Sequence, residues 1–258
     1  MISAIVFSRD RACQLDLLLT SLSRNAPGLF EVTVLWFSRQ DDFREAYAIC
    51  ESEHPEATFV PENGLTYQVR HYARLAKGLT FFTDDSVLFR EVTLEPILTL
   101  AQEQVLTFSL RLGENTTVCY PHDSKQIVPE SPDGPVRIWR YRGAQGDFSY
   151  PMSLDGHLFR GDDILSLIED RHFSTPNSLE EILMSQKIGR PLMASYPHSC
   201  LVGIPVNRVQ DTHPNRHANS YSPADLNERY LRGKRINLDA LDFSDIRGAH
   251  QELELVLA

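Results

Sequence analysis

Two adjacent carboxylates, Asp84 and Asp85, follow an apolar run in the segment FFTDDS. Two neighbouring negative charges destabilise a folded chain unless they are solvated or paired with a cation. A divalent cation such as Mg²⁺ or Mn²⁺ is a suitable partner, because hard cations take oxygen ligands and bridge them to phosphate groups. The spacing alone also allows a second interpretation, in which the pair is an exposed acidic turn.

The elements expected before this pair alternate between short apolar strands and longer amphipathic helices. Strands are expected at residues 3–7, 32–37, 58–60 and 79–82, with helices at 13–24, 41–53 and 65–77 between them. This alternation predicts strand-helix-strand units and therefore an α/β fold with a largely parallel sheet. Ligands of such sheets bind beyond the carboxyl ends of the strands, which is where Asp84 and Asp85 would lie.

The second half of the chain has a less regular pattern. Helices are expected at residues 94–103, 162–170, 178–186 and 223–231, with a strand at 105–110 and a polar, turn-rich stretch from 113 to 151. Such a stretch often forms a loop that faces a substrate. No internal repeat or linker composition divides the chain, so we expect a single domain over residues 1–258, although the length also fits two.

The composition limits the classes of partner. The 258 residues carry 35 acidic and 25 basic side chains, and the net charge of -10 argues against general attraction to nucleic acid or anionic membranes. No apolar run approaches the roughly 20 residues of a membrane helix, and the first residues lack the charge order of a secretory signal. A cytoplasmic protein is therefore expected. The 4 cysteines are scattered without a CxxC pair, which predicts buried thiols.

The order of the elements, together with FFTDDS, resembles the nucleotide-sugar-binding half of GT-A glycosyltransferases of the family 2-like, bacterial type. The resemblance implies a GT-A-like, Rossmann-type mixed sheet flanked by helices in a single domain. It also implies that Asp84 contacts the donor ribose and that Asp85, with Asp84, holds Mn²⁺ or Mg²⁺. Thr83 or Ser86 stands at one position where the family often has aspartate.

Two further segments are similar to the donor side of this family. VFSRDRACQLDLLLTSL resembles the opening strand, loop and helix, which implies that Ser8, Arg9 and Arg11 line the nucleotide pocket. LTYQVRHYARLAKGL resembles the basic helix that precedes the acidic motif, which implies that Arg70 contacts the nucleotide or a phosphate. Taken without the resemblance, an arginine on a helix is more often a solvated residue or part of an ion pair.

The acceptor side is indicated by SLDGHLFRGDDIL followed by NSLEEILM, which are similar in order to the family's pattern. The similarity implies Asp155, Glu180 and Glu181 as catalytic candidates. An inverting enzyme needs a carboxylate that takes the proton of the acceptor hydroxyl, and Glu181 is the first choice; a retaining enzyme would not use this base. Both glutamates would also suit the first turn of a helix capped by Asn177 or Ser178, where they would only stabilise the helix.

Residues 205–235 form a basic segment in an otherwise acidic chain, with six basic side chains against three acidic ones. Forked arginine donors suit an anionic diphosphate, and Arg208 is assigned to the donor site for this reason. Enzymes of the resembled family often complete the metal site with a late histidine. This implies His213 as a metal ligand beside Asp84 and Asp85.

These features predict a metal-assisted glycosyltransferase that moves a sugar from a nucleotide-sugar donor to a hydroxyl of a glycan or other acceptor. Residues 1–90 would bind the donor, and residues 91–258 the acceptor. Two alternatives stay open: a metal-dependent hydrolase that uses His213 and His217 with the acidic pair, and a non-catalytic nucleotide-sugar-binding or glycan-binding module. The absence of GxGxxG, GxxxxGKS/T, HExxH and GxSxG motifs counts against dinucleotide, P-loop, zincin and α/β-hydrolase sites. The donor base and sugar, the acceptor, the stereochemistry and the oligomeric state stay open.

Overall fold

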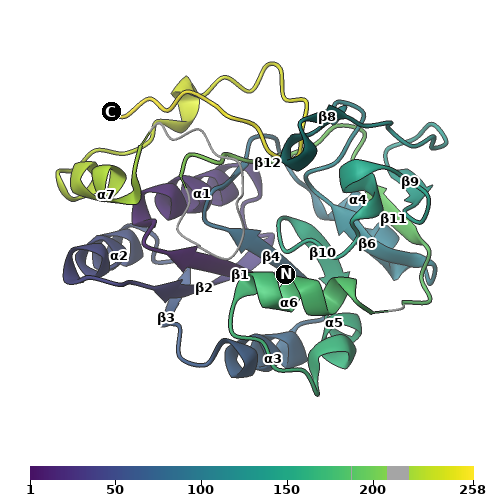
Figure 1. Ribbon diagram of the computed structural model, residues 1–258, viewed down its shortest axis with the longest axis horizontal. Coiled ribbons are helices and arrows are strands. Elements are labelled where there is room, and N and C mark those ends of the chain that lie inside the picture. Colours follow the sequence, from purple (N-terminus) through teal and green to yellow (C-terminus); the bar gives the residue numbers. More distant parts are fainter. Residues whose placement is uncertain (187, 208–220) are drawn as a thin grey trace.

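One eight-stranded sheet runs through both halves of the chain in the computed structural model, which describes residues 1–186, 188–207 and 221–258 (Figure 1). The strand order is β3-β2-β1-β4-β10-β6-β11-β9, and two small sheets pair β12 with β5 and β7 with β8. The strands are β1 (Ile2–Arg9), β2 (Phe30–Phe37), β3 (Thr58–Pro61), β4 (Gly78–Thr83), β5 (Ser86–Leu88), β6 (Val105–Ser109), β7 (Val118–Cys119), β8 (Ser124–Lys125), β9 (Arg137–Arg140), β10 (His157–Arg160), β11 (Leu192–Ser195) and β12 (Leu201–Gly203). The α-helices are α1 (Ala12–Asn25), α2 (Asp41–Glu53), α3 (Leu65–Leu75), α4 (Leu94–Ile97), α5 (Gly161–Ile168), α6 (Pro176–Met184) and α7 (Pro223–Leu231).

The predicted parallel half is confirmed. Strands β1 to β4 pair in parallel, because α1, α2 and α3 each carry the chain from the carboxyl end of one strand back to the start of the next. The other half makes the sheet mixed: β10 runs antiparallel to both β4 and β6, while β11 runs parallel to β6 and antiparallel to β9. The α/β class, the mixed sheet and the single domain therefore agree with the prediction.

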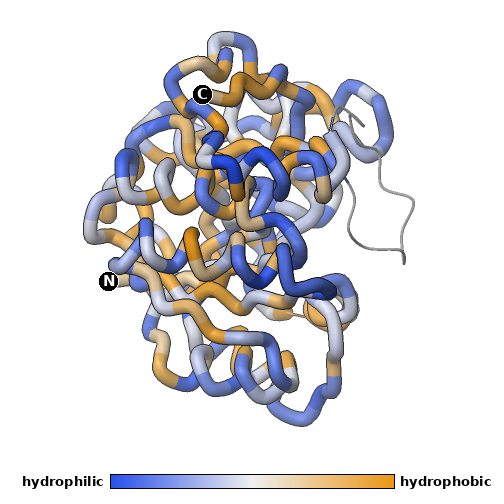
Figure 2. The backbone as a smooth tube through the Cα atoms, turned by 90° about the vertical axis from the view of Figure 1, so that its left-hand side faces the viewer, coloured by the Kyte–Doolittle hydropathy of each residue, from blue (hydrophilic) through white to orange (hydrophobic). Residues whose placement is uncertain are grey.

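Helices cover both faces of the sheet, and the side chains of β1 alternate between the two cores. Val6 belongs to the core covered by α1, α2 and α7, whereas Ile5 and Phe7 belong to the core covered by α3, α5 and α6 (Figure 1). Hydrophobic segments occupy the interior and hydrophilic turns lie outside, as Figure 2 shows. This burial fixes the strand register and so determines which residues reach the sheet edge.

Two expectations for the second half are wrong in detail. The helix expected at residues 94–103 is only one turn, α4, followed by a 3₁₀ helix (Leu98–Ala101). The stretch from 113 to 151 is not one open loop, because it contains β7, β8, β9 and the 3₁₀ helices Tyr120–His122 and Gly146–Ser149.

The chain beyond α7 returns across the molecule to the sheet edge (Figure 1, yellow). Parallel bridges join Val118 to Gly248 and Gly203 to His250. A Cβ atom on Gly203 would lie 2.4 Å from His250 Cδ2, so only glycine permits this approach. The late segment thereby brings His250 to the end of β12.

Two further predictions from the sequence concern the state of the cysteines and the presence of membrane-spanning helices. All four cysteines, Cys13, Cys50, Cys119 and Cys200, are buried free thiols, as predicted. Among the described residues, no helix combines the length and the apolar character that crossing a membrane requires.

Helix α6 begins at Pro176, and its cap is Thr175 rather than Asn177 or Ser178. The Thr175 hydroxyl accepts from the Ser178 amide at 3.1 Å, and the Ser178 hydroxyl accepts from the Thr175 amide at 3.1 Å. We expect Thr175→Ala to lower the free energy of unfolding by about 1 kcal/mol, because one amide of the first turn loses its acceptor. Urea unfolding measures this. Thr175→Ser keeps the hydroxyl and should stay close to wild type, and an equal loss in both variants would contradict the capping explanation.

Candidate functional site

The acidic pair lies at the carboxyl edge of the parallel strands, where the sequence places it. Asp84 and Asp85 form the turn between β4 and β5, and the Asp84 amide donates to a β1 carbonyl at 3.2 Å. Just past β1 the chain turns at Asp10, whose φ of 54° lies in the left-handed region. The Asp10 carboxylate is held by the Arg39 amide at 2.9 Å and by Arg39 Nε at 2.5 Å. This turn positions the next residue, Arg11, over the acidic pair.

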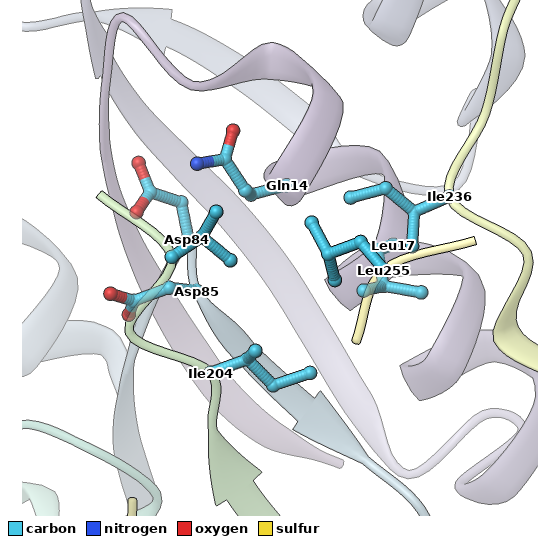
Figure 3. Close-up of a pocket in the computed structure, with 8 residues that line it drawn as sticks. Gln14, Leu17, Asp84, Asp85, Ile204, Ile236 and Leu255 are labelled. Carbon is cyan, nitrogen blue, oxygen red and sulfur yellow. The ribbon is translucent and has the colours of Figure 1, made fainter. Parts of the chain in front are cut away.

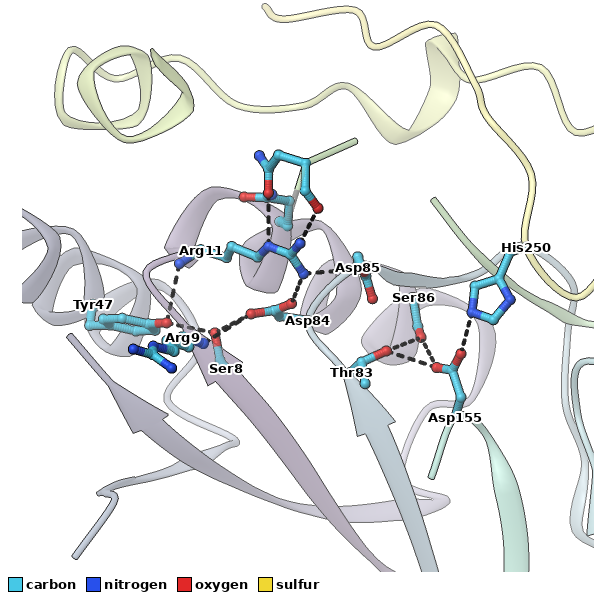
Figure 4. Close-up of polar contacts among 12 residues, drawn as sticks. Ser8, Arg9, Arg11, Tyr47, Thr83, Asp84, Asp85, Ser86, Asp155 and His250 are labelled. Atoms are coloured by element: carbon cyan, nitrogen blue, oxygen red, sulfur yellow. Dashed lines mark hydrogen bonds and ion pairs between the residues drawn. The ribbon is translucent and has the colours of Figure 1, made fainter. Parts of the chain in front are cut away.

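Asp84 is engaged by neighbours from β1 and the loop that follows it (Figure 4). Its Oδ2 accepts from Ser8 Oγ at 2.9 Å and from the Arg9 amide at 3.1 Å, while Oδ1 accepts from Arg11 Nη1 at 2.9 Å. Burial raises the pKa of Asp84, and the positive charge of Arg11 partly offsets this effect. Ser8 Oγ is also 2.7 Å from the Tyr47 hydroxyl, so α2 helps to hold the site.

Arg11 balances part of the acidic charge. Its Nη1 also contacts Asp85 Oδ2 at 3.1 Å, its Nε donates to Asn207 Oδ1 at 2.9 Å, and its Nη2 donates to the Asn207 carbonyl. The Arg11 side chain is only 9% exposed, so a single positive charge faces two carboxylates with little water between them. When both carboxylates are ionised, the group keeps a negative charge that a further cation can balance.

The carboxylate oxygens of Asp84 and Asp85 suit a hard divalent cation. Among the described residues, the one cluster of three His, Cys, Asp or Glu ligand atoms lies elsewhere, so this site offers one or two carboxylates. Mg²⁺ sites commonly consist of one or two carboxylates completed by water and substrate phosphates. The cavity beside the pair, lined by Gln14, Ile204 and others, has about 10 Å³ of free volume (Figure 3). A phosphate must therefore approach from the solvent side of Asp85, whose side chain is 20% exposed.

A third carboxylate, Asp155, lies next to the end of β4 and is held by Arg111 and by the neighbours Thr83, Ser86 and His250, which Figure 4 shows beside it. Its Oδ1 accepts from Thr83 Oγ1 at 2.8 Å and from Ser86 Oγ at 2.7 Å. Its Oδ2 lies 2.8 Å from Arg111 Nη1 and 2.9 Å from His250 Nε2. Burial alone would raise the pKa of Asp155, but the hydrogen bond from His250 and the charge of Arg111 hold it well below its usual range. Asp155 therefore stays ionised and is suited to positioning its neighbours.

Glu180 and Glu181 have different surroundings although they are adjacent. Glu180 Oε1 accepts from the Leu154 amide at 3.0 Å, which places it beside the Asp155 segment. Burial raises the pKa of Glu180. Glu181 is exposed on the same helix. The structure therefore brings Glu180 and Asp155 together and leaves Glu181 at the surface.

A surface hollow of about 470 Å³ lies beyond the end of β3 and is lined in part by Glu62, Tyr67, Arg70 and His172. Arg70 Nε donates to a carbonyl of α5 at 3.0 Å, so the guanidinium also holds the end of that helix. Burial raises the pKa of Glu62, and the positive charge of Arg9 lowers it. The hollow follows the end of β3 and the acidic pair follows the end of β4, a strand that runs parallel to β3 in the sheet, so both lie beyond the carboxyl ends of the parallel strands.

Three residues of this edge are missing from the sequence prediction: Arg111, Asn207 and His250. Arg111 comes just after β6, which runs in the same direction as β4 because β10 is antiparallel to both. A basic residue just past such a strand is the sequence signal that could have identified Arg111. No local pattern marks His250 or Asn207, because distant segments bring them to the site. The predicted residues Arg208 and His213, with His217, lie outside the described residues.

The fold and site define an α/β protein with an acidic, ligand-accessible edge. No protein-family model matches the chain. By sequence, it is 26% identical over 276 aligned residues to the Bifunctional glycosyltransferase pgtA of Dictyostelium discoideum, a match that spans 92% of this chain and 36% of that relative. The chain thus covers about a third of this curated relative, whose class is the one that the sequence motifs resemble.

Solved structures with partial similarity include two further proteins. The mannosyltransferase PcManGT of Pyrobaculum calidifontis, in complex with GDP-Man and Mn²⁺, has 14% identity and a TM-score of 0.46, over 76% of this chain and 54% of its own. S. aureus TarS has 14% identity and a TM-score of 0.47, over 78% of this chain and 36% of its own.

Proposed function

We propose that this chain is a metal-assisted glycosyltransferase that moves a sugar from a nucleotide-sugar donor to a hydroxyl of a glycan or other acceptor. The observation that carries the proposal is the acidic pair beyond the carboxyl end of β4, bridged by Arg11, on the same side of the sheet as a hollow of about 470 Å³. The sequence match to a bifunctional glycosyltransferase supports the same class. A hexosyl or related sugar and a cytoplasmic setting belong to the proposal.

The donor side is proposed from the arrangement along the edge. The hollow is within the range of small-molecule sites, about 300 to 1000 Å³. Tyr67, which is 72% exposed, offers a ring on which a nucleoside base can stack, and Arg70 lines the same space. The Arg9 amide donates to Asp84 at 3.1 Å and the Arg9 guanidinium lies over the Phe37 ring at 5.4 Å, and we assign this arginine at the end of β1 to the diphosphate. Ser8 and Arg11 hold the Asp84 carboxylate in position through their hydrogen bonds to it.

Asp85 is the residue that we assign to the divalent cation, with Asp84 beside it. A bound Mn²⁺ or Mg²⁺ would neutralise the negative charge that develops on the departing diphosphate. Ser8 and the Arg9 amide fix Asp84, while Asp85 is the more exposed of the two carboxylates. Arg208 and His213 stay in the proposal as donor and metal contacts.

Glu180 is the residue that we assign as general base. Its carboxylate would take the proton of the acceptor hydroxyl as that oxygen bonds to the anomeric carbon and the bond to the diphosphate breaks. The raised pKa makes Glu180 a stronger base than an ordinary carboxylate. Asp155 stays ionised and positions Arg111 and His250 nearby.

A thermal-shift panel of nucleoside diphosphates and sugar nucleotides, each with Mn²⁺, Mg²⁺ or chelator, tests the donor site. We expect one nucleoside to raise the Tm in a metal-dependent manner, because a ligand at 100 times its Kd adds about 2.7 kcal/mol to the stability of the native state. At the same nucleotide and metal concentrations, the metal-dependent part of the shift should disappear in Asp85→Asn. No shift with any nucleotide would contradict the proposal.

Product analysis distinguishes the proposed activity from the two alternatives. A transferase releases nucleotide in proportion to acceptor that receives sugar. A metal-dependent hydrolase would release free sugar or phosphate without an acceptor, and a non-catalytic module would bind the sugar nucleotide without turnover.

A further inference from the structure

A buried group of metal-ligating side chains lies between α1 and α2, apart from the acidic pair. It consists of Asp16, Cys50 and His54, whose ligand atoms all lie within 4.8 Å of one another. The exposed fractions are 6% for Asp16, 0% for Cys50 and 7% for His54. The three side chains therefore present oxygen, sulfur and nitrogen donors to one enclosed point.

The helices explain why these side chains meet. Cys50 and His54 are four residues apart at the end of α2, so they project from one face of the helix. Asp16 projects from α1, which packs against α2, and its Oδ1 lies 2.9 Å from His54 Nε2. A pair of ligands at this helical spacing, joined by a third from a neighbouring helix, is an arrangement that holds metal ions in many proteins.

The second nitrogen of His54 is also positioned. Its Nδ1 lies 3.4 Å from Glu56 Oε1. Metal-bound histidines usually donate their other ring N–H to a carboxylate or carbonyl, which fixes the tautomer and turns the free lone pair toward the metal. With Glu56 facing Nδ1, the lone pair of the neutral ring would be on Nε2, which is the nitrogen that faces Asp16.

Tyr230 and Arg235 enclose the group of Asp16, Cys50 and His54 on the side of α7. The Tyr230 hydroxyl lies 3.5 Å from Asp16 Oδ1 and donates to Glu53 Oε2 at 3.2 Å. Arg235 stacks on the Tyr230 ring at 3.8 Å and pairs with Glu53 at 2.6 Å. Tyr230 is thus near enough to supply a fourth ligand or to bind a water in that position.

We propose that Asp16, Cys50 and His54 form a buried binding site for a divalent metal of intermediate softness, such as Zn²⁺. The mixed sulfur, nitrogen and oxygen donors favour this class over the hard cations that suit Asp85. The site is independent of the proposed sugar transfer, and it links α1 to α2.

The charges at the proposed site balance when the metal is bound. In the metal-free state His54 Nε2 lies against the Asp16 carboxylate, and Cys50 is a neutral thiol because burial raises its pKa. Binding of M²⁺ would form bonds to His54 Nε2, Cys50 Sγ and an Asp16 oxygen, and it would release the thiol proton of Cys50 to the solvent. The two positive charges of the metal then face the thiolate of Cys50 and the carboxylate of Asp16, so no uncompensated charge is buried.

The test is a Co²⁺ titration of the full chain after treatment with chelator and reductant. We expect one equivalent of Co²⁺ to saturate the visible bands of a four-coordinate site and a near-ultraviolet thiolate-to-cobalt band. Zn²⁺ should remove both bands, and calorimetry in buffers of different ionisation enthalpy should show that metal binding releases protons. Absence of the thiolate band in the folded protein at saturating Co²⁺ would overturn the proposal.

Matched variants locate the site. Cys50→Ser should lose the thiolate band, while Cys119→Ser, which removes another buried thiol, should keep it. Asp85→Asn should also keep it, which separates this metal from the one proposed for the donor. Retention of the band in a folded Cys50→Ser would overturn the assignment. If that variant does not fold, X-ray absorption of the Zn²⁺-loaded wild type must show one sulfur ligand, and a shell of only oxygen and nitrogen would overturn it equally.

Discussion

Replacement of Asp85 by asparagine should lower the turnover number of sugar transfer by a factor of about 100 to 1000 at saturating donor and Mn²⁺. Asparagine keeps the shape of the side chain but removes the charge that balances a metal bridging to the diphosphate. The loss should appear in the chemical step, because negative charge on the departing diphosphate grows in the transition state. Single-turnover measurements with a labelled donor report this step directly.

The fold should tolerate this substitution, because Arg11 keeps its contact with Asp84 at 2.9 Å when Asp85 is neutral. Circular dichroism and the unfolding midpoint check this. Asp41→Asn is the matched control, since Asp41 is an exposed aspartate whose partner is Arg44 on the same helix. Turnover at the wild-type rate in Asp85→Asn would exclude Asp85 from the metal site.

Glu180→Gln should lower kcat by a factor of about 100 to 10,000 and leave the KM for the donor nearly unchanged. The amide keeps the acceptor oxygen that faces the Leu154 amide at 3.0 Å, but it cannot take a proton at neutral pH. Glu181→Gln is the matched neighbour, and its exposed side chain should change kcat only a few-fold. A large loss of kcat in Glu181→Gln with little change in Glu180→Gln would instead support Glu181, the choice made from the sequence. An unchanged kcat in both variants would indicate a mechanism that uses neither glutamate as a base.

The pH profile gives a second readout of Glu180. The base acts when deprotonated, so kcat should rise with pH through the pKa of Glu180. Burial raises that pKa, and the acidic limb should therefore lie above the ordinary glutamate value of about 4.3. The limb should vanish in Glu180→Gln, whatever activity remains.

The sequence predicts the first half of the fold well, because local patterns determine it. Strands β1, β2 and β4 are short apolar runs, and their burial on both faces follows from their composition, whereas β3 is an edge strand without a buried residue. Asp84 and Asp85 needed no tertiary information to be placed at the edge, since they directly follow β4.

The remaining features depend on contacts between distant segments. Arg70 is on the predicted helix, but the carbonyl that it binds belongs to Ile168. The difference between Glu180 and Glu181 arises from the packing of α6, whose cap at Thr175 also sets the start of the helix. A periodic pattern gives the face of a helix, but it does not identify the segment that packs there.

The return of the late segment to the sheet edge has a consequence for biosynthesis. Asp155 gains its His250 partner, and Gly203 its bridge, only when the final part of this sequence has left the ribosome. At usual elongation rates that is on the order of ten seconds after Asp155 itself has been made. During this interval Arg111 can pair with Asp155, but His250 cannot. A nascent chain can therefore pair β1 to β4 early, but it completes the contacts of Asp155 at the carboxyl ends of the strands only after His250 has been made.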